Sequence, residues 1–335
     1  MKVLFDHNLP FLLAHGGMEI QIEQTKAALE RIGVDVDYLR WWDANQSVDV
    51  LHYFGRIPVG LIQFAHAKGI KIVQAELLTG QGSRPMWQHY LHRFVIRGCE
   101  ALLPESVVHH FNWSSRRLAD ACIALTPWEA QLMVEIFGAP ANRVHVVPNG
   151  VEELFFRSAA APRGKWLVCT ATITERKRVL ELAEAAVSAQ TPLWMIGRPY
   201  ADGDPYARRF LQLANQHPSI IRYEGPVQDR NQLADIYHGS RGFVLLSAME
   251  SLSLSALEAA AGQCPLLLSD LPWARTVFGD SVSYCPVTSH TPTTAEHLRR
   301  FYDSAASLPC PLKPMTWVDV AHQLKAIYDT ICASH

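Results

Sequence analysis

Two carboxylates close together in the sequence are the residues best suited to chemistry. Glu250 follows an apolar run that ends near Ala248, and Glu258 lies about two helical turns further along. A helix that starts between them would expose unpaired backbone N–H groups. The residues at this start are Ser251, Leu252, Ser253 and Leu254. Because a carboxylate accepts paired hydrogen bonds from vicinal hydroxyls, this spacing favours a sugar and a ribose as ligands over a phosphate.

Glu258 also fits a purely structural role. The run Ser255-Ala256-Leu257-Glu258 matches a capping box, in which Glu258 would only satisfy N–H groups at the helix start. Without further information, both interpretations of Glu258 stay open.

Three basic residues, Arg176, Lys177 and Arg178, open the helix predicted after the strand 166–170. A cation there would face the same side of the sheet as Glu250, since open α/β sheets bind ligands at the carboxyl ends of their strands. Lys177 would then neutralise a diphosphate leaving group. The alternative is that one or two of the three cations are only solvated.

Gly16 and Gly17 follow His15 and open the first predicted helix. Free N–H groups and the helix dipole favour a phosphate or carboxylate at such a start, and glycine permits a close approach. The alternative is that the two glycines only let the chain turn into the helix.

The elements that must position these residues alternate between short β-branched runs and helical patterns. The predicted strands are 2–5, 34–39, 48–53, 70–74, 121–125 and 144–147, followed by 166–170, 193–196, 220–223, 243–246 and 265–269. The predicted helices are 17–32, 178–189, 205–216, 230–239, 253–262 and 317–331. This order predicts an α/β fold with two Rossmann-like, doubly wound domains, each with a parallel sheet covered on both faces.

A length of 335 residues also favours two domains. Pro148-Asn149-Gly150-Val151 has the composition of a sharp connection and is interpreted as a hinge. The predicted domains are therefore 1–150 and 151–312, with a terminal helix in 313–335.

Composition excludes several classes of protein. Lys plus Arg total 30 and Asp plus Glu total 32, and no basic block stands out, so a nucleic-acid partner is not expected. The apolar runs fall far short of the ~20 residues of a spanning helix, and the N-terminal residues do not fit a signal peptide. The seven cysteines include no C-x-x-C pair, which argues against disulfides and a zinc cluster. We expect a cytoplasmic protein.

Together these motifs resemble the retaining nucleotide-sugar glycosyltransferases of GT-B fold, glycosyltransferase family 4. The resemblance covers nearly the whole chain and is most specific in the segment from Glu250 to Glu258. The other matching elements are Gly16-Gly17, Ala119-Asp120-Ala121, Pro148-Asn149-Gly150-Val151, Lys177, the run from Ala259 to Pro265, and Trp317-Val318-Asp319-Val320-Ala321. The last of these is similar to the start of the family's terminal helix, which crosses back onto the first domain.

The resemblance implies a hexosyltransferase of glycoconjugate or polysaccharide biosynthesis, whose two domains face a cleft. The first domain would bind a glycan, lipid-linked or small-molecule acceptor, and the second a nucleoside diphosphate sugar. Glu250 and Lys177 would be catalytic, and Glu258 would bind the ribose. The remaining donor contacts would be Gly16, Gly17, Arg176, Val227 near the base, Ser251, Leu252, Ser253 and Leu254. The resemblance implies no metal and no bound cofactor, because cationic side chains and helix N-termini replace the cation.

Three departures from the family pattern motivate a second hypothesis. Serines replace the usual glycines between Glu250 and Leu254, and Thr172 stands where an arginine commonly precedes the lysine. A histidine often found after the fourth strand is not evident in Gln74-Ala75-Glu76. The alternatives to a transferase are a sugar-nucleotide-binding protein of the same fold without catalysis and a sugar-nucleotide epimerase.

The segment from Pro85 to Cys99 has an apolar stripe at helical spacing with basic edges. The stripe consists of Trp87, Tyr90, Leu91, Phe94 and Val95, and its edges of Arg84, His89, His92, Arg93 and Arg97. We expect the stripe to pack in the core. The alternative is a weak association with the inner face of a membrane, where the stripe would present a lipid-linked acceptor. The pairs His89/His92 and His109/His110 lack further ligands at metal spacing, so ordinary histidines are expected.

Overall fold

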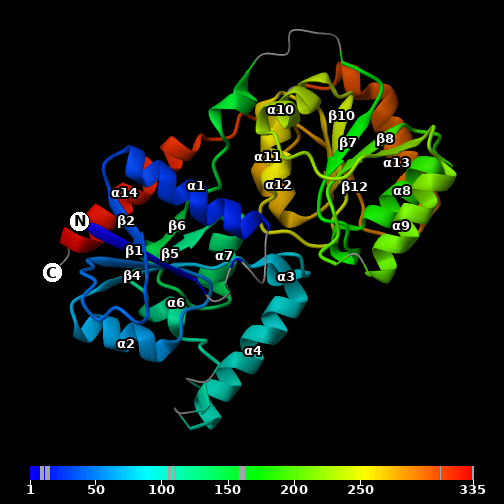
Figure 1. Ribbon diagram of the computed structural model, residues 1–335. Helices are drawn as coiled ribbons and strands as arrows, with labels where there is room; N and C mark the ends of the chain where they lie inside the picture. The colour runs from blue at the N-terminus through cyan, green and yellow to red at the C-terminus, as the bar shows by residue number, and fades with distance from the viewer. Residues whose placement is uncertain are drawn as a thin grey trace. The chain divides into compact units, whose positions relative to one another are not determined.

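The chain forms two compact units, as a computed structural model shows (Figure 1). The first unit comprises Met1–Gly150 with Met315–His335, and the second comprises Val151–Pro314. The structure describes residues 1–7, 11, 16–104, 107–108, 111–157, 163–201, 203–309 and 311–333. His15, His109 and His110 lie outside the described residues.

The first unit is built on a parallel sheet in the order β2-β1-β3-β4-β5-β6. The strands are β1 (Lys2–His7), β2 (Asp35–Tyr38), β3 (Val50–Phe54), β4 (Lys71–Ala75), β5 (Ala121–Ala124) and β6 (Val144–Val146). The helices are α1 (Gly17–Arg31), α2 (Val59–Ala67), α3 (Thr79–Gly82), α4 (Met86–Leu102), α6 (Ser115–Leu118), α7 (Pro127–Glu135) and α14 (Trp317–Ala333), with a 3₁₀ turn η1 (Ala141–Arg143). Because β3 and β4 are parallel neighbours, the residues that follow them meet at one edge of the sheet.

The second unit contains a parallel sheet in the order β12-β11-β10-β7-β8-β9. The strands are β7 (Leu167–Thr170), β8 (Leu193–Ile196), β9 (Ile221–Tyr223), β10 (Gly242–Leu245), β11 (Leu266–Ser269) and β12 (Ser283–Cys285). The helices are α8 (Val179–Ser188), α9 (Pro205–Gln216), α10 (Arg230–Gly239), α11 (Leu254–Ala261), α12 (Pro272–Phe278) and α13 (Thr291–Ser304), with 3₁₀ turns η2 (Glu153–Phe156), η3 (Glu175–Lys177) and η4 (Ala305–Ser307). Because β7 and β10 are parallel neighbours, the loops that follow these two strands lie at the same edge of the sheet.

The predicted α/β class with two doubly wound sheets is confirmed, and the predicted strands match observed ones closely. The prediction missed β12 and several helices, including α2. The sequence of α2 is apolar around nearly its whole circumference, so it shows no helical period. β12 has only three residues, too few for an alternating pattern.

A glycine, Gly33, ends α1. Gly33 adopts φ +82°, a backbone conformation that residues other than glycine rarely adopt. Its N–H bonds to the Glu30 carbonyl at 3.0 Å, and the Val34 N–H bonds to the Leu29 carbonyl at 3.0 Å. These two bonds form a Schellman motif, which satisfies the last carbonyls of the helix.

The terminal helix α14 packs beside α1 in the first unit (Figure 1). Its start lies against Gly150, where a Cβ would be 2.6 Å from both the N and the Cα atoms of Trp317. A backbone contact this short leaves no room for any side chain at position 150. Gly150 therefore allows the start of α14 to lie this close to the backbone that follows β6.

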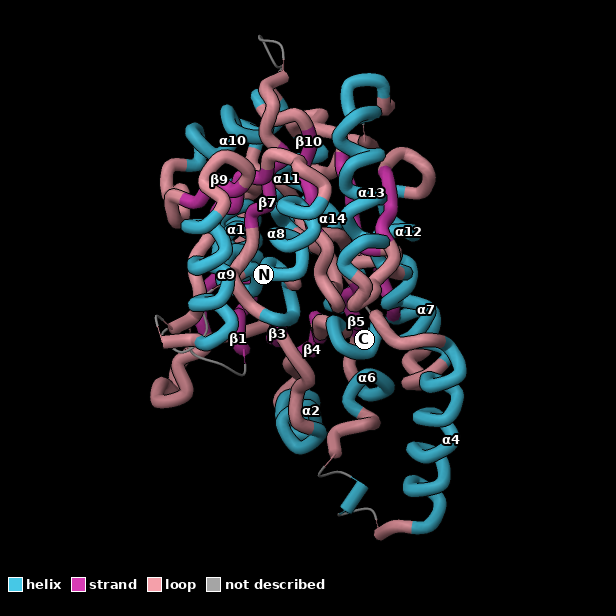
Figure 2. Tube along the Cα trace, turned by 90° about the vertical axis from the view of Figure 1, so that its right-hand side faces the viewer, coloured by secondary structure: helices cyan, strands magenta, loops and turns pink. Residues whose placement is uncertain are grey.

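Helix α4 contradicts the prediction of core packing. Figures 1 and 2 both show it extending away from the sheet of its unit, and its buried residues are His89 and Ile96. The stripe points outward, with Trp87 64% and Phe94 76% exposed. The other exposed apolar side chains of α4 are Tyr90, Leu91, Val95 and Leu102. No described helix combines the length and apolar character needed to cross a membrane.

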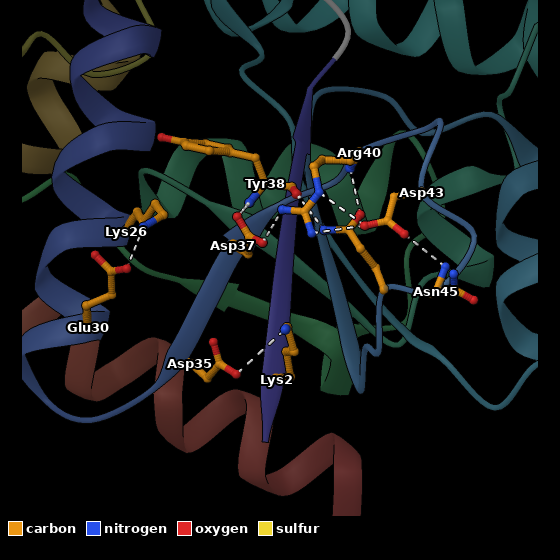
Figure 3. Close-up of polar contacts among 10 residues, drawn as sticks. Lys2, Lys26, Glu30, Asp35, Asp37, Tyr38, Arg40, Asp43 and Asn45 are labelled. Carbon is orange, nitrogen blue, oxygen red and sulfur yellow. Dashed lines mark hydrogen bonds and ion pairs between the residues drawn. The ribbon is translucent and has the colours of Figure 1, made fainter.

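Surface ion pairs line the β2 edge of the first sheet (Figure 3). The Arg40 guanidinium contacts Asp37 at 2.6 Å and Asp43 at 3.1 Å. All three side chains are roughly one third exposed, so these pairs contribute little to stability. The two carboxylates do give the Arg40 guanidinium acceptors on both sides.

Substitution of Gly150 tests the close approach of α14. We expect Gly150→Ala to destabilise the protein by about 1 to 3 kcal/mol, because backbone must move to admit the methyl group. Gly60→Ala is the matched control, since a Cβ at Gly60 meets nothing within 4 Å. Thermal unfolding should show a lower midpoint for Gly150→Ala and an unchanged or higher one for Gly60→Ala. Equal midpoints would contradict the packing described.

Candidate active site

The second unit brings Glu250 and Lys177 into direct contact. Lys177 follows β7 and Glu250 follows β10, and the Ala248 N–H bonds to the Arg176 carbonyl at 2.8 Å, which joins the two loops. The Glu250 carboxylate forms ion pairs with the Lys177 ammonium and, at 3.1 Å, with Nη1 of Arg176. Nη1 of Arg176 also donates to the Met249 carbonyl at 3.0 Å. The predicted acid and cation thus lie at one edge of the sheet.

Burial makes this cluster electrostatically strong. The side chain of Glu250 is 8% exposed and that of Lys177 is 13% exposed. A carboxylate removed from water needs charged partners, and here two cations surround it. One carboxylate and two cations leave a net positive charge, which suits a diphosphate, while the carboxylate oxygens suit hydroxyl groups.

The turn that carries Lys177 is tightly built. Thr174 caps it, because its hydroxyl accepts a hydrogen bond from the Lys177 N–H at 3.3 Å. Arg178 then adopts a left-handed conformation with φ 52°, and its buried side chain donates to the Thr288 carbonyl. A strained non-glycine residue of this kind costs on the order of 1 kcal/mol or more and is typical of functional turns. The turn holds Lys177 toward Glu250.

The alternative of a capping box from Ser255 to Glu258 does not hold. α11 begins two residues earlier than that box requires, with Ser253 as its N-cap, and the Ser253 hydroxyl accepts from the Ala256 N–H at 3.4 Å. Glu258 therefore lies inside the helix and takes no part in the cap. The residues before α11 are buried, and they are Ser251, Leu252 and Ser253.

The carboxylate of Glu258 pairs with an arginine that sequence reasoning missed. Arg230 lies 2.6 Å from Oε1 of Glu258, and it also pairs with Glu152. The Tyr237 hydroxyl donates to Oε2 of Glu258 at a longer 3.4 Å. Burial raises the pKa of Glu258, and the Arg230 guanidinium opposes that shift. Since a carboxylate has about four acceptor positions, Glu258 keeps capacity for a further donor.

One signal in the sequence points to Arg230. It is the first residue of α10, after the N-cap Asp229. A cation at a helix N-terminus is disfavoured by the helix dipole, so an arginine there needs carboxylate partners from elsewhere. Glu152 and Glu258 are those partners.

The other predicted donor contacts belong to other segments of the two units. Val227 is half-buried in the loop between β9 and α10. Gly16 is the N-cap of α1 with φ 144°, and Gly17 is the first residue of that helix, both in the first unit. Thr172 stands where the family commonly has an arginine. The nearby Arg176 places its guanidinium in contact with Glu250. Among the described residues, no group of three or more His, Cys, Asp or Glu side chains is arranged to hold a metal ion.

Comparisons with known proteins identify the family. Residues 164–304 match the family model described as glycosyl transferases group 1. A D-inositol 3-phosphate glycosyltransferase of Nocardiopsis dassonvillei is 30% identical in an alignment of 312 residues that covers 87% of this chain and 66% of that protein. The chain belongs to the group 1 glycosyltransferases.

A second relative of the same name, from Xylanimonas cellulosilytica, is 31% identical over 195 residues. This chain spans 46% of that relative's length.

Solved structures of the GT-B fold resemble this chain along nearly its whole length. Sucrose-phosphate synthase from Thermosynechococcus elongatus has a TM-score of 0.69 at 16% identity, with all of both chains covered. Anabaena HepE in complex with UDP and glucose has a TM-score of 0.65 at 12% identity, covering 98% of this chain and 100% of that one. At these identities the likeness shows the fold, so the GT-B fold predicted from the sequence is confirmed.

Two variants of the Arg230 cluster, which consists of Arg230, Glu152 and Glu258, should lose different amounts of unfolding free energy. Arg230→Met leaves two carboxylates without their cation, so we expect a loss of about 3 kcal/mol in unfolding free energy. Glu258→Gln leaves Arg230 with Glu152, so we expect a loss of only about 1 kcal/mol. Denaturant unfolding of both variants and the parent measures these differences.

The loss of stability in Arg230→Met should depend on pH in a defined direction. The pKa of Glu258 is already raised in the folded state, and loss of Arg230 raises it further, so the folded state binds the proton more tightly than the unfolded state does. The deficit of Arg230→Met should therefore grow as the pH rises above 5 and shrink below it. A deficit that does not change between pH 5 and pH 8 would contradict this assignment.

Proposed function

We propose that this glycosyltransferase transfers a glycosyl unit from a nucleoside diphosphate sugar to an acceptor hydroxyl, with retention at the anomeric carbon and without a metal ion. The observation that supports it best is the buried Glu250 carboxylate, which pairs with Lys177 and Arg176 at the edge of the second sheet. Parallel α/β sheets bind ligands at this edge.

Each charged group has a role in the proposed reaction. The bond between the anomeric carbon and the diphosphate breaks as the acceptor oxygen bonds to that carbon. The departing diphosphate takes the electron pair, so charge grows on it, and it then takes up the proton of the acceptor hydroxyl. Lys177 and Arg176 stabilise that charge, which is the role a divalent cation would otherwise fill. Glu250 accepts hydrogen bonds from hydroxyls of the transferred sugar and so positions it for attack. No protein nucleophile is proposed.

The remaining contacts hold the rest of the donor. Glu258 accepts hydrogen bonds from the ribose, and the main chain near Val227 contacts the base. The N–H groups from Ser251 to Leu254 add donors to the transferred sugar. Gly16 and Gly17 open α1 of the first unit, where free N–H groups suit a phosphate, and the first unit binds the acceptor.

The relatives support a choice of substrates. The curated relatives are named for D-inositol 3-phosphate, and HepE holds UDP and glucose. We therefore propose a uridine nucleotide as the donor carrier and a hydroxylated acceptor, either a small molecule, a glycan or a lipid-linked sugar.

The test is a turnover assay with a panel of nucleoside diphosphate sugars, in which release of the nucleoside diphosphate is followed with and without an acceptor. We expect turnover to persist in EDTA and the product to keep the anomeric configuration of the donor by NMR. Glu250→Gln should lower turnover about a hundredfold or more, with unchanged affinity for the nucleoside diphosphate. Glu296→Gln, which changes an exposed glutamate of α13, is the matched control.

Other outcomes would contradict the proposal. Binding without turnover under any condition would favour a non-catalytic sugar-nucleotide-binding protein, and interconversion of donor sugars would favour an epimerase. Loss of activity in EDTA that magnesium restores would contradict metal independence, and near-normal turnover of Glu250→Gln would remove that residue from the active site.

We also propose that the exposed face of α4 rests on an anionic membrane surface. This face joins aromatic and aliphatic side chains, with Trp87 64% and Phe94 76% exposed. The exposed charged residues beside it, Arg84 and Arg97, are basic, while Glu100 of the same helix is paired with Arg117. An amphipathic helix with basic edges binds anionic lipid interfaces through both its apolar area and its charge. In that position, the first unit would meet a lipid-linked acceptor.

Vesicle sedimentation tests the membrane proposal. We expect binding to vesicles that contain anionic phospholipid, weaker binding at high salt, and a loss of at least tenfold in the double variant Trp87→Ser, Phe94→Ser. The matched control is Trp41→Ser, Trp42→Ser, which removes two aromatic side chains that are 87% and 68% exposed elsewhere in the first unit. Equal losses in both double variants would contradict the proposal. So would a dimer that dissociates only in the α4 variant, because a second copy would then cover this face.

A further inference from the structure

Two adjacent tryptophans lie exposed on the loop that follows β2 in the first unit. Trp41 is 87% exposed and Trp42 is 68% exposed, although an indole is among the side chains that gain most from burial. Their rings lie edge to face, with centroids 5.6 Å apart and an angle of 88° between the planes. Contiguous exposed aromatic side chains mark interaction sites, whereas single exposed apolar residues are ordinary.

The two tryptophans occupy a hydrogen-bonded turn. The Asp43 N–H bonds to the Arg40 carbonyl at 2.9 Å, which makes Trp41 and Trp42 the two central residues of the turn. Because the turn follows β2, which runs parallel to β1, it lies at the carboxyl edge of the first sheet. Open α/β sheets bind their ligands at this edge.

Side-chain contacts fix the shape of this turn (Figure 3). The Arg40 N–H donates to Oε1 of Gln46 at 2.7 Å, and Nε2 of Gln46 donates to the Tyr38 carbonyl at 3.0 Å. The Arg40 guanidinium contacts the carboxylates of Asp37 and Asp43. Exposed contacts of this kind add little to stability, but they hold the turn in one conformation. Less conformational freedom is therefore lost when a ligand binds there.

The groups beside the indoles favour a saccharide. A sugar ring has a face of C–H groups that packs against an aromatic ring, and a rim of hydroxyls that donate hydrogen bonds. The side chains of Asp37 and Asp43 are 36% and 30% exposed, and a carboxylate has about four acceptor positions, so both can accept from such hydroxyls. Hydrogen bonds from the Asn45 N–H and from Arg40 lower the pKa of Asp43, which keeps this acceptor charged.

The charge of the turn disfavours anionic partners. Arg40 with Asp37 and Asp43 is one cation with two carboxylates, a net charge of −1. An anionic lipid surface or a nucleic acid would meet like charge here, in contrast to the basic edges of α4. A neutral saccharide meets no such repulsion.

We infer that Trp41 and Trp42 form a platform for the sugar rings of a glycan acceptor, whose hydroxyls donate to Asp37 and Asp43. This inference rests on the proposed function, because it assigns the acceptor to the first unit. It selects one class among the hydroxylated acceptors, a glycan of two or more sugar residues. The two indole planes are nearly perpendicular, so one flat ring cannot stack on both, and successive sugar residues can.

Saturation-transfer NMR on the full chain tests the platform, with glucose, maltohexaose, cellohexaose and chitohexaose as probes. We expect at least one hexasaccharide to bind in the millimolar range or tighter, and glucose to bind about tenfold more weakly or not at all. The double variant Trp41→Ser, Trp42→Ser should lose about tenfold or more in affinity, and Trp41→Phe, Trp42→Phe should recover part of the loss. The matched control is Trp87→Ser, Phe94→Ser, which removes exposed aromatic side chains of α4 and should leave saccharide affinity unchanged.

Turnover separates this inference from the proposed function. With a bound hexasaccharide as acceptor, Trp41→Ser, Trp42→Ser should raise the acceptor KM about tenfold and leave kcat and the donor KM unchanged, since the turn binds acceptor away from the reacting atoms. A parent that neither binds UDP nor turns over any donor counts against the proposed function, while the binding assay still tests the tryptophans.

Four outcomes would overturn the inference. They are no binding of any hexasaccharide by the parent, equal saccharide affinity in the two serine double variants, an acceptor KM that Trp41→Ser, Trp42→Ser leaves unchanged, and a dimer of the parent that only this variant dissociates. In the last case a second copy of the chain covers the indoles.

Discussion

The contact of Glu250 with Lys177 and Arg176 is the interaction on which the candidate site depends. It exists because β7 and β10 are parallel neighbours, which places the loops after them at one edge of the second sheet. The hydrogen bond from the Ala248 N–H to the Arg176 carbonyl then fixes the two loops to each other. A buried carboxylate needs charged partners to compensate for its loss of hydration, and these two cations supply them.

Three largely buried clusters among the described residues each place one charged side chain between two of opposite sign, but they differ in net charge. Glu250 lies between two cations and Glu76 between two arginines, so both clusters have positive excess. Arg230 lies between two carboxylates, Glu152 and Glu258, so that cluster has negative excess. The Glu250 cluster suits phosphate oxygens, and the Arg230 cluster suits the hydroxyls of a ribose.

Local patterns in the sequence predicted the fold and the nearness of Glu250 to Lys177, because strand order and loop position follow from them. They failed where a tertiary neighbour decides the outcome. Ser253 and Ser255 are both suitable caps by type, and only the actual start of α11 distinguishes them. The stripe of α4 has the same spacing whether it is buried or exposed, so periodicity could not reveal that no described neighbour covers it. The pairing of Arg230 with Glu152 and Glu258 joins distant parts of the chain, which spacing alone does not indicate.

Hydrogen exchange with and without UDP tests most directly whether the cluster around Glu250 and Lys177 binds the donor. The account predicts slower exchange on UDP addition in the turn 174–178 and in the segment 247–258, and a smaller effect for Lys177→Ala at the same UDP concentration. Protection confined to the first unit, or protection of these segments that is unchanged in Lys177→Ala, would contradict it.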